Sequence, residues 1–217
     1  MFWRRIMLRS GWCLAALLAF ALTAQAHRLD EYLQATLVGV ETNGVSVQLS
    51  LTPGVGVSDA VLALIDLNHD HQISTHEANA YAERVRSALA LSFDGKPLNL
   101  QVTEVQSPPY AELQSGLGTI QLKLRAPFAL LPPGAHELKF ENRHRRELSV
   151  YLVNALMPTS PEIQITQQVR DSIQSESRIL FNYAPKDAVG SKWFGAIAFG
   201  VLIAGFAAVY WRASRRV

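Results

Sequence analysis

Cysteine is nearly absent from this chain, whose 217 residues contain only one, Cys13. Cys13 lies in an apolar stretch near the N-terminus, so the rest of the chain can form neither a disulfide framework nor a cysteine-ligated metal site. The chain also has no Asn-x-Ser/Thr acceptor for N-glycosylation. Secreted eukaryotic domains commonly carry one of these features, so their joint absence favours a bacterial envelope protein.

Motifs of the common enzyme classes are missing as well. The chain has no Gly-x-Ser-x-Gly elbow, and its single cysteine is not placed to act as a nucleophile. Gly116-Leu117-Gly118 is too short for a nucleotide-binding loop and precedes a predicted strand rather than a helix. We therefore expect a protein that is not an enzyme. An enzyme whose active-site residues are scattered along the chain is an alternative that ranks behind the two binding functions considered below.

A surplus of positive charge is absent from the central part of the chain. The whole sequence has 20 basic and 18 acidic residues. Three arginines lie in each terminal segment, and without them 14 basic residues face 18 acidic ones. The six are Arg4, Arg5, Arg9, Arg212, Arg215 and Arg216. A surface with net charge near −4 argues against nucleic acid as a partner, because phosphate binding requires a basic surface.

The first 26 residues have the pattern of a secretory signal peptide. Three arginines precede an apolar run from Cys13 to Thr23, and Ala24-Gln25-Ala26 forms an Ala-x-Ala cleavage site. The run is short for a membrane span, which favours cleavage over an uncleaved anchor. We expect the mature chain to begin at His27.

The C-terminal segment predicts a transmembrane helix over residues 191–212. Trp193 to Trp211 is a run of 19 residues without a charge, with aromatic residues at both ends and arginines after it. Positive charges favour the cytoplasmic side, so residues 213–217 are expected in the cytoplasm and residues 27–190 in the periplasm. This predicts a single-pass protein of the bacterial inner membrane. Small residues recur on one face and could contact a membrane protein partner. They are Ala196, Gly200, Ala204 and Ala208.

Most of the region 27–190 has the pattern of β-structure. Val45 to Leu51 alternates apolar and polar residues, follows Asn43-Gly44, and has a hairpin partner in Tyr32 to Val40. Further short strands are predicted around residues 120–125, 138–140, 150–153, 163–166 and 179–183, and Asp94-Gly95 marks a second tight turn. We expect a mainly β fold, an antiparallel sandwich-like domain, with a helical pair inserted after the second strand.

Between the two predicted helices, residues 66–77 carry oxygen atoms at a regular spacing. Side-chain oxygens fall at loop positions 1, 3, 5, 9 and 12, and position 7 adds a backbone carbonyl. These residues are Asp66, Asn68, Asp70, Ser74, Glu77 and, for the carbonyl, Gln72. Ile73 at position 8 is an apolar anchor between the helices. The second helix is predicted over Glu77 to Leu91, with a Ser-x-x-Glu capping box of Ser74 and Glu77 at its start. The segment 58–91 resembles the EF-hand family, and the resemblance implies a Ca²⁺ site with these ligands.

One loop position departs from the family. Position 6, normally glycine because the chain turns there with positive φ, is His71. The strain of a non-glycine residue is about 1 kcal/mol. With only three carboxylates, the single loop is expected to bind Ca²⁺ weakly, with a Kd on the order of 10⁻⁵ to 10⁻³ M.

Histidines offer an alternative metal site. A mature N-terminal His27 would present an amine and an imidazole, which suit Cu²⁺ or Ni²⁺ better than Ca²⁺, and His136 and His144 could complete such a site.

The polar segment 141–146 is either a solvated turn or a docking patch for an acidic partner. Our leading expectation is a non-catalytic, calcium-binding, membrane-anchored periplasmic accessory protein. A copper- or nickel-handling protein is the second.

Overall fold

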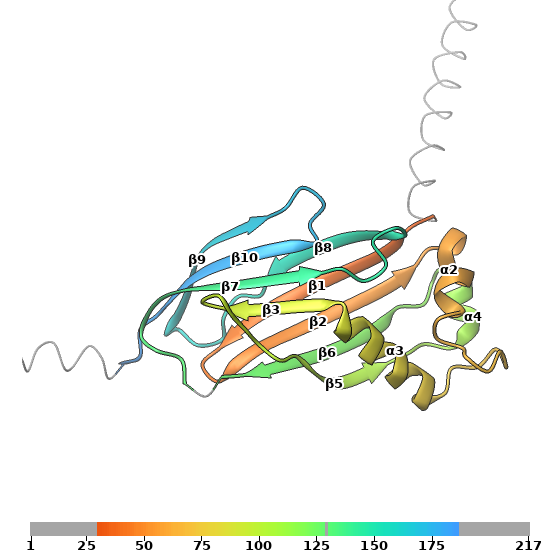
Figure 1. The fold of residues 1–217 in the computed structure, drawn as a ribbon, viewed down its shortest axis with the longest axis horizontal. Helices are drawn as coiled ribbons and strands as arrows, with labels where there is room; N and C mark the ends of the chain where they lie inside the picture. Colours follow the sequence, from red (N-terminus) through yellow and green to blue (C-terminus); the bar gives the residue numbers. More distant parts are fainter. Residues whose placement is uncertain (1–29, 129, 187–217) are drawn as a thin grey trace, which may run out of the picture.

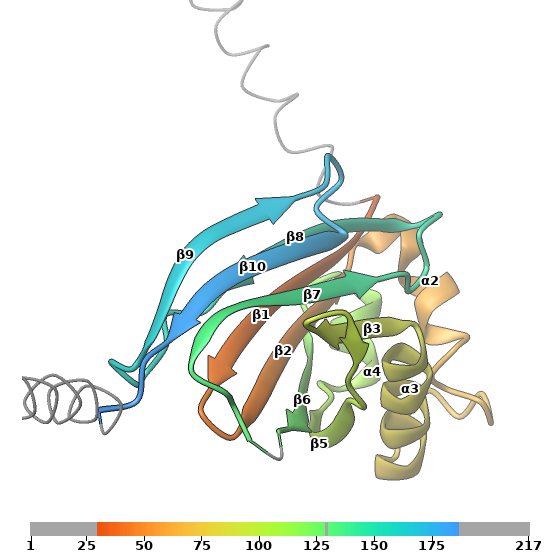
Figure 2. The same ribbon diagram turned by 60° about the vertical axis from the view of Figure 1, so that its left-hand side comes forward.

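Two five-stranded sheets lie face to face in the structure, which is a computed structural model describing residues 30–128 and 130–186 (Figure 1; Figure 2). The first sheet consists, in order across it, of β5 (Gln101–Gln106), β6 (Ile120–Pro127), β2 (Gly44–Pro53), β1 (Tyr32–Glu41) and β8 (Ser149–Ala155). The second consists of β4 (Lys96–Pro97), β3 (Leu89–Phe93), β7 (Gly134–Asn142), β10 (Glu176–Tyr183) and β9 (Ile163–Arg170).

Three helices lie at one end of the two sheets (Figure 1). They are α2 (Val55–Leu62), α3 (Thr75–Ser87) and α4 (Tyr110–Gln114). Helix α3 packs against β5 and β3, while α2 and α4 pack against each other and against β2. The helices therefore close the end of the sandwich at which β2 stops and β3 starts.

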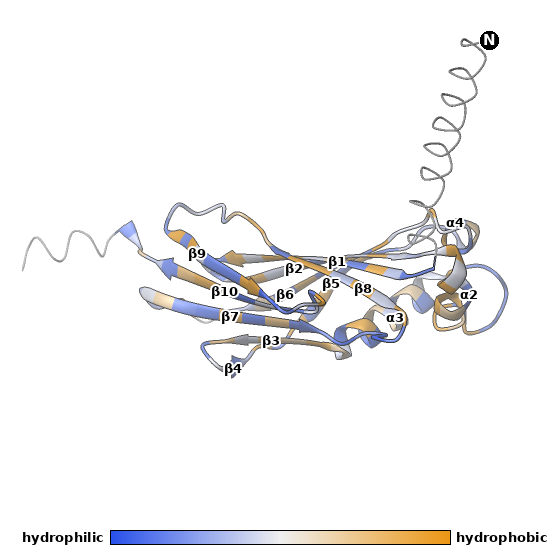
Figure 3. Ribbon diagram, turned by 90° about the horizontal axis from the view of Figure 1, so that it is seen from above, coloured by the Kyte–Doolittle hydropathy of each residue, from blue (hydrophilic) through white to orange (hydrophobic). Residues whose placement is uncertain are grey.

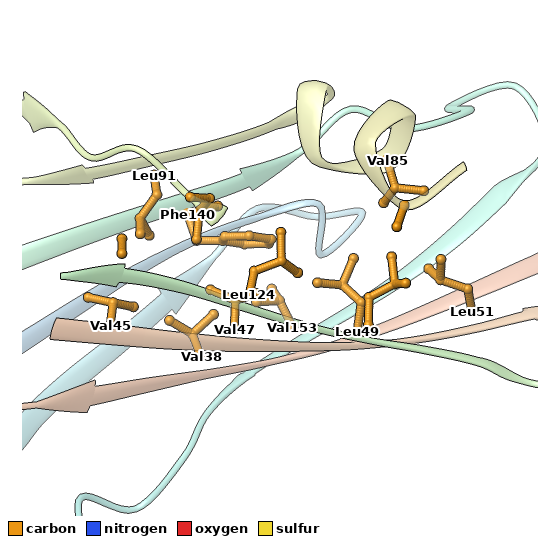
Figure 4. Close-up of a cluster of buried hydrophobic side chains, with 14 of the residues drawn as sticks. Val38, Val45, Val47, Leu49, Leu51, Val85, Leu91, Leu124, Phe140 and Val153 are labelled. Atoms are coloured by element: carbon orange, nitrogen blue, oxygen red, sulfur yellow. The ribbon is translucent and has the colours of Figure 1, made fainter. Parts of the chain in front are cut away.

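The alternating residues of β2 explain the position of the core. Val45, Val47, Leu49 and Leu51 are fully buried between the sheets, whereas Ser46, Gln48 and Ser50 face outward and are less buried. Figure 4 shows Phe140 and Leu91 facing these side chains from the second sheet, and Val85 of α3 covering the end near Leu51. Sheets and helix thus share one continuous apolar core.

Both tight turns predicted from the sequence join antiparallel strands. Tyr32–Glu41 and Gly44–Pro53 pair in continuous register, and Asp94 and Gly95 connect β3 to β4 with φ values of 47° and 76°. A positive φ at both turn residues matches the twist of the flanking strands, which explains the Asp-Gly sequence. The predicted β1–β2 hairpin is confirmed, with Thr42 and Asn43 as its turn residues, and the tight turn predicted at Asp94-Gly95 is confirmed.

The prediction that all strands pair antiparallel is wrong in one place. β8 pairs with β1 in parallel, with Tyr32 opposite Ser149 and Val38 opposite Ala155. The chain passes from β7 of the second sheet to β8 of the first at the end where β1 begins, so the two strands run in the same direction. The alternation of apolar residues in a strand does not reveal the direction of its neighbour.

The predicted C-terminal transmembrane helix requires a correction, because nothing in the described residues supports it. The described residues are mainly β-structure, and none of the helices among them has the length and apolar character needed to cross a membrane. The longest, α3, has 13 residues, whereas a span needs about 20. That prediction rested on the length and apolar character of residues 193–211, the aromatic residues at both ends and the arginines that follow. Residues 191–212 and 213–217, the signal peptide 1–26 and His27 lie outside the described residues.

The predicted helix boundaries also shift. The second helix ends at Ser87, and Leu89 to Leu91 begin strand β3 instead of continuing the helix. Leu89 has helical spacing from Val85, but Leu89 and Leu91 also alternate, and pairing with Phe140 and Asn142 of β7 favours the strand. Tertiary pairing here outweighs a local pattern.

Candidate metal-binding loop

Residues 66–77 form the connection from α2 to α3, beyond the end of the sandwich. Figure 3 shows this polar loop in blue, past α2 and away from both sheets. The chain keeps helix-like backbone bonds after α2, the last from Asp66 N–H to the Leu62 carbonyl at 2.9 Å. Asp66 therefore leaves the helical end in a fixed direction, with its side chain turned into the loop.

The Asp66 carboxylate is the centre of the loop's hydrogen bonds. Its Oδ1 accepts the N–H of Asp70 at 3.2 Å, and its Oδ2 accepts the N–H of His71 at 3.0 Å. Asn68 Oδ1 also accepts the Asp70 N–H, at 3.0 Å. The Asp70 Oδ1 in turn accepts the N–H of Gln72 at 2.8 Å. The first half of the loop is thus wound around the side chains that the sequence proposes as ligands.

Glu77 closes the loop from the first turn of α3. Its Oε1 accepts the N–H of Leu67 at 3.0 Å, across the whole loop. Its Oε2 accepts from both the N–H and the hydroxyl of Ser74, at 3.0 and 2.7 Å, and Ser74 Oγ accepts the N–H of Glu77. This is the predicted capping box. The bonds from Ser74 lower the pKa of Glu77, so the carboxylate is charged at neutral pH.

The backbone of the loop contains two left-handed residues. His69 has a φ of 60° and His71 a φ of 59°. Position 6 therefore adopts the positive φ that the spacing predicts, although it is not glycine. His69 and His76 are exposed, and Ile73 packs partly buried against the core.

Two carboxylates of the loop are buried without a cationic side chain. Asp66 is 2% exposed and Glu77 is 5% exposed. Among the described residues, neither forms an ion pair with a lysine, arginine or histidine. Backbone N–H groups offset part of the desolvation of a buried carboxylate, but a neighbouring cation is its usual partner. The loop is therefore electrostatically suited to a bound cation.

The acidic side chains do not by themselves form a metal cage. In residues 30–128 and 130–186, no three His, Cys, Asp or Glu side chains are placed together to hold a metal ion. The predicted set is mixed, because three carboxylates are joined by an amide, a hydroxyl and a backbone carbonyl. Since Ser74 holds Glu77 Oε2, binding of a cation by the full set requires Glu77 to exchange that bond.

The alternative histidine site is not assembled by the described residues. His136 Nδ1 lies 2.8 Å from Asp94 Oδ2 and its Nε2 lies 2.7 Å from the Pro132 carbonyl, so both nitrogens already have a polar partner. His144 lies beyond the other end of β7, about 20 Å away by strand length. His27 is outside the described residues.

The segment 141–146 combines a surface cluster with a buried histidine. Arg143 and Arg146 both pair with Glu141, and Arg145 pairs with Glu147 at 3.0 Å. His144 is 4% exposed, and its Nε2 lies 3.0 Å from the Tyr81 hydroxyl, which in turn lies 2.7 Å from the Tyr32 hydroxyl. The segment is therefore more than a solvated turn, since His144 links helix α3 to both sheets.

One residue near the loop was missed by the sequence analysis. The ring of Tyr110, at the start of α4, stacks on the ring of His71 with centroids 4.9 Å apart. No pattern in the sequence connects the two, because 39 positions and three strands separate them. Only the packing of α4 against α2 brings them together.

Comparisons of the chain with protein-family models, with curated proteins and with solved structures find no match. Its function is therefore inferred from its own residues.

Proposed function

We propose that this protein is a non-catalytic, calcium-binding domain that acts outside the cytoplasm. The cation would be held by Asp66, Asn68, Asp70, Ser74 and Glu77 together with the carbonyl of Gln72. Hard oxygen ligands of this kind suit Ca²⁺. The extracytoplasmic setting rests on the cleavage pattern Ala24-Gln25-Ala26.

The observation that carries the proposal is the burial of Asp66 and Glu77 without a cationic partner. Both lie at the two ends of one 12-residue loop, and the Leu67 N–H bond already brings Glu77 back to its start. Both carboxylates also accept N–H groups of the loop, but neutral amide or hydroxyl oxygens can accept such bonds without the desolvation of a charge.

Calcium in this loop would stabilise the helical end of the sandwich. The loop is the only covalent link from α2 to α3, and α3 carries Tyr81 into the buried contact with His144 and Tyr32. A ligand that binds the folded loop and not the unfolded chain raises stability by about 2.7 kcal/mol at 100 times its Kd. The ion would thus fix α2, α3 and the sheets relative to one another.

The substitution Glu77→Gln tests this proposal. Glutamine keeps one carbonyl oxygen for the capping box but cannot also accept the Leu67 N–H, so calcium-free stability should fall somewhat, and a charged bidentate ligand is lost. We expect millimolar Ca²⁺ to raise the Tm of the full chain, and Glu77→Gln to abolish the rise. Differential scanning calorimetry with and without Ca²⁺ measures both quantities.

Glu83→Gln is the matched control, since Glu83 is exposed on the same helix and forms its ion pair with Arg86. It should leave the calcium-dependent rise in Tm intact. An equal rise in the wild type and in Glu77→Gln would contradict the assignment of the site.

A further inference from the structure

Tyr110 contacts the candidate loop from outside it. Its ring lies nearly parallel to that of His71, with an interplanar angle of 26° and a centroid distance of 4.9 Å. His71 is the sixth loop residue and holds a φ of 59°, a conformation that most non-glycine residues avoid. The stack is therefore made at one of the two left-handed residues of the loop.

Helix α4 fixes Tyr110 independently of the loop. Leu113, one turn later, is fully buried. Gly116, just after the helix, has a φ of 74°, and a Cβ there would lie 3.0 Å from Val55 Cγ2 at the start of α2. This close approach requires glycine and ties α4 to α2. Because α4 also connects two strands of the first sheet, the sandwich itself sets the position of the Tyr110 ring.

A small pocket lies where helix α4 meets the loop. Its volume is about 140 Å³, and it lies between the end of α2, the loop and α4. Its lining residues are Asp59, Leu62, Ala63, Asp66, His69, His71 and Tyr110. His71 is held from both sides of this pocket, because its ring packs on Tyr110 while its N–H donates to Asp66 Oδ2.

We propose that Tyr110 is a positioning residue for the cation loop. By stacking on His71 it stabilises the left-handed backbone at position 6 and keeps the His71 N–H directed at Asp66, the first ligand. The loop then needs no glycine at this position. This inference rests on the proposed calcium function, and it assigns part of the site to α4, outside the helix-loop-helix.

The stabilisation by the Tyr110–His71 stack and the cost of the left-handed backbone at His71 are similar in magnitude. An aromatic stack changes an equilibrium constant by about two- to tenfold. The left-handed conformation of a non-glycine residue acts against the folded loop by a similar factor. Loss of the stack alone should therefore raise the Kd for Ca²⁺ by about two- to tenfold.

The test compares Tyr110→Leu with Tyr110→Phe in the full chain. Leucine keeps the bulk of the side chain without the ring, and phenylalanine keeps the ring. We expect Tyr110→Leu to raise the Kd for Ca²⁺ by about two- to tenfold, Tyr110→Phe to leave it unchanged, and Tyr110→Leu to have no effect in the His71→Gly background. Glu112→Ala, at an exposed site on the same helix, is the control. Calorimetric titration gives each Kd.

A second readout does not depend on calcium. The proton resonance of the His71 ring should lose its ring-current shift in Tyr110→Leu and retain it in Tyr110→Phe. An unchanged Kd in Tyr110→Leu, or an effect of equal size in the His71→Gly background, would overturn the role of Tyr110. A wild-type chain that binds no Ca²⁺ would instead overturn the proposed function, which the resonance shift does not test.

Discussion

Two buried side chains, Tyr81 and His144, join helix α3 to the sandwich. The Tyr81 hydroxyl lies between His144 Nε2 and the Tyr32 hydroxyl, and the His144 carbonyl accepts from Tyr151 and Gln34. Burial lowers the pKa of His144 to about 4, with Arg145 and Arg84 acting in the same direction and Glu147 against it. The ring is therefore neutral at pH 7, which removes the need for a buried counter-charge.

Acid should destabilise the protein through His144. The unfolded histidine has a pKa near 6.5, so the unfolded state binds a proton first and stability falls as pH drops from about 6.5 to about 4. The shift corresponds to about 3 kcal/mol. We expect His144→Gln to remove most of this dependence, measured by urea unfolding of the full chain at a series of pH values.

His76→Gln serves as the control for the acid experiment, because His76 is exposed at the start of α3. It should leave the slope of stability against pH unchanged. If His144→Gln has the same slope as the wild type between pH 6.5 and 4, His144 does not titrate as its burial implies.

At the scale of elements, the edge strand β8 is protected by side chains of β9. Gln168 donates to the Val153 carbonyl and accepts the N–H of Ala155, and Arg170 Nε donates to the Val153 carbonyl at 2.6 Å. These bonds occupy backbone groups that would otherwise be free at the sheet edge. Exposed edges with unpaired backbone groups favour association between molecules.

Removal of this protection should promote self-association. We expect Gln168→Val to leave the Ala155 N–H without its partner, with Arg170 still bound to the Val153 carbonyl, and to increase the weight-average mass of the full chain in sedimentation experiments. Gln167→Val introduces the same side chain at an exposed position of the same strand and is the matched control. Equal masses for the two variants would contradict a protective role of Gln168.

The elements differ in how far the sequence predicts them. Alternating residues and the Asn-Gly sequence located the β1–β2 hairpin, and Asp94-Gly95 located the turn between β3 and β4, because these patterns are local. The parallel pairing of Tyr32 with Ser149 could not be predicted, since it depends on where a distant strand crosses between sheets. Leu89 was assigned to a helix because helical and strand spacing overlap there.

The loop shows the same division. The spacing of Asp66 and Glu77 predicted which side chains face the loop interior, and the capping box at Ser74 followed from two residues three positions apart. The stack of Tyr110 on His71 is a long-range contact without a sequence pattern. The ligand spacing and the capping box depend on local backbone geometry, whereas the Tyr110–His71 stack depends on the packing of α4.

At the scale of the whole molecule, the sandwich closes at one end with three helices and a charged loop. The buried carboxylates Asp66 and Glu77, the helix α3 and the Tyr81–His144 contact form a continuous path from the loop to both sheets. A cation in the loop would therefore act on the stability of the entire domain. Because α3 is attached to both sheets through Tyr81 and His144, a change in the stability of the loop would be transmitted to the sheets.

Calorimetric titration of the purified mature chain, which is expected to begin at His27, with Ca²⁺, Mg²⁺ and Cu²⁺ tests the central claim most directly. We expect one Ca²⁺ per chain with a Kd on the order of 10⁻⁵ to 10⁻³ M, and weaker binding of Mg²⁺, which tolerates less variation in geometry. Cu²⁺ should bind no more tightly than it binds a peptide that begins His27-Arg28-Leu29, because only a folded site adds further nitrogen ligands. The absence of Ca²⁺ binding, or a much tighter Cu²⁺ affinity that His27→Ala abolishes, would contradict the account.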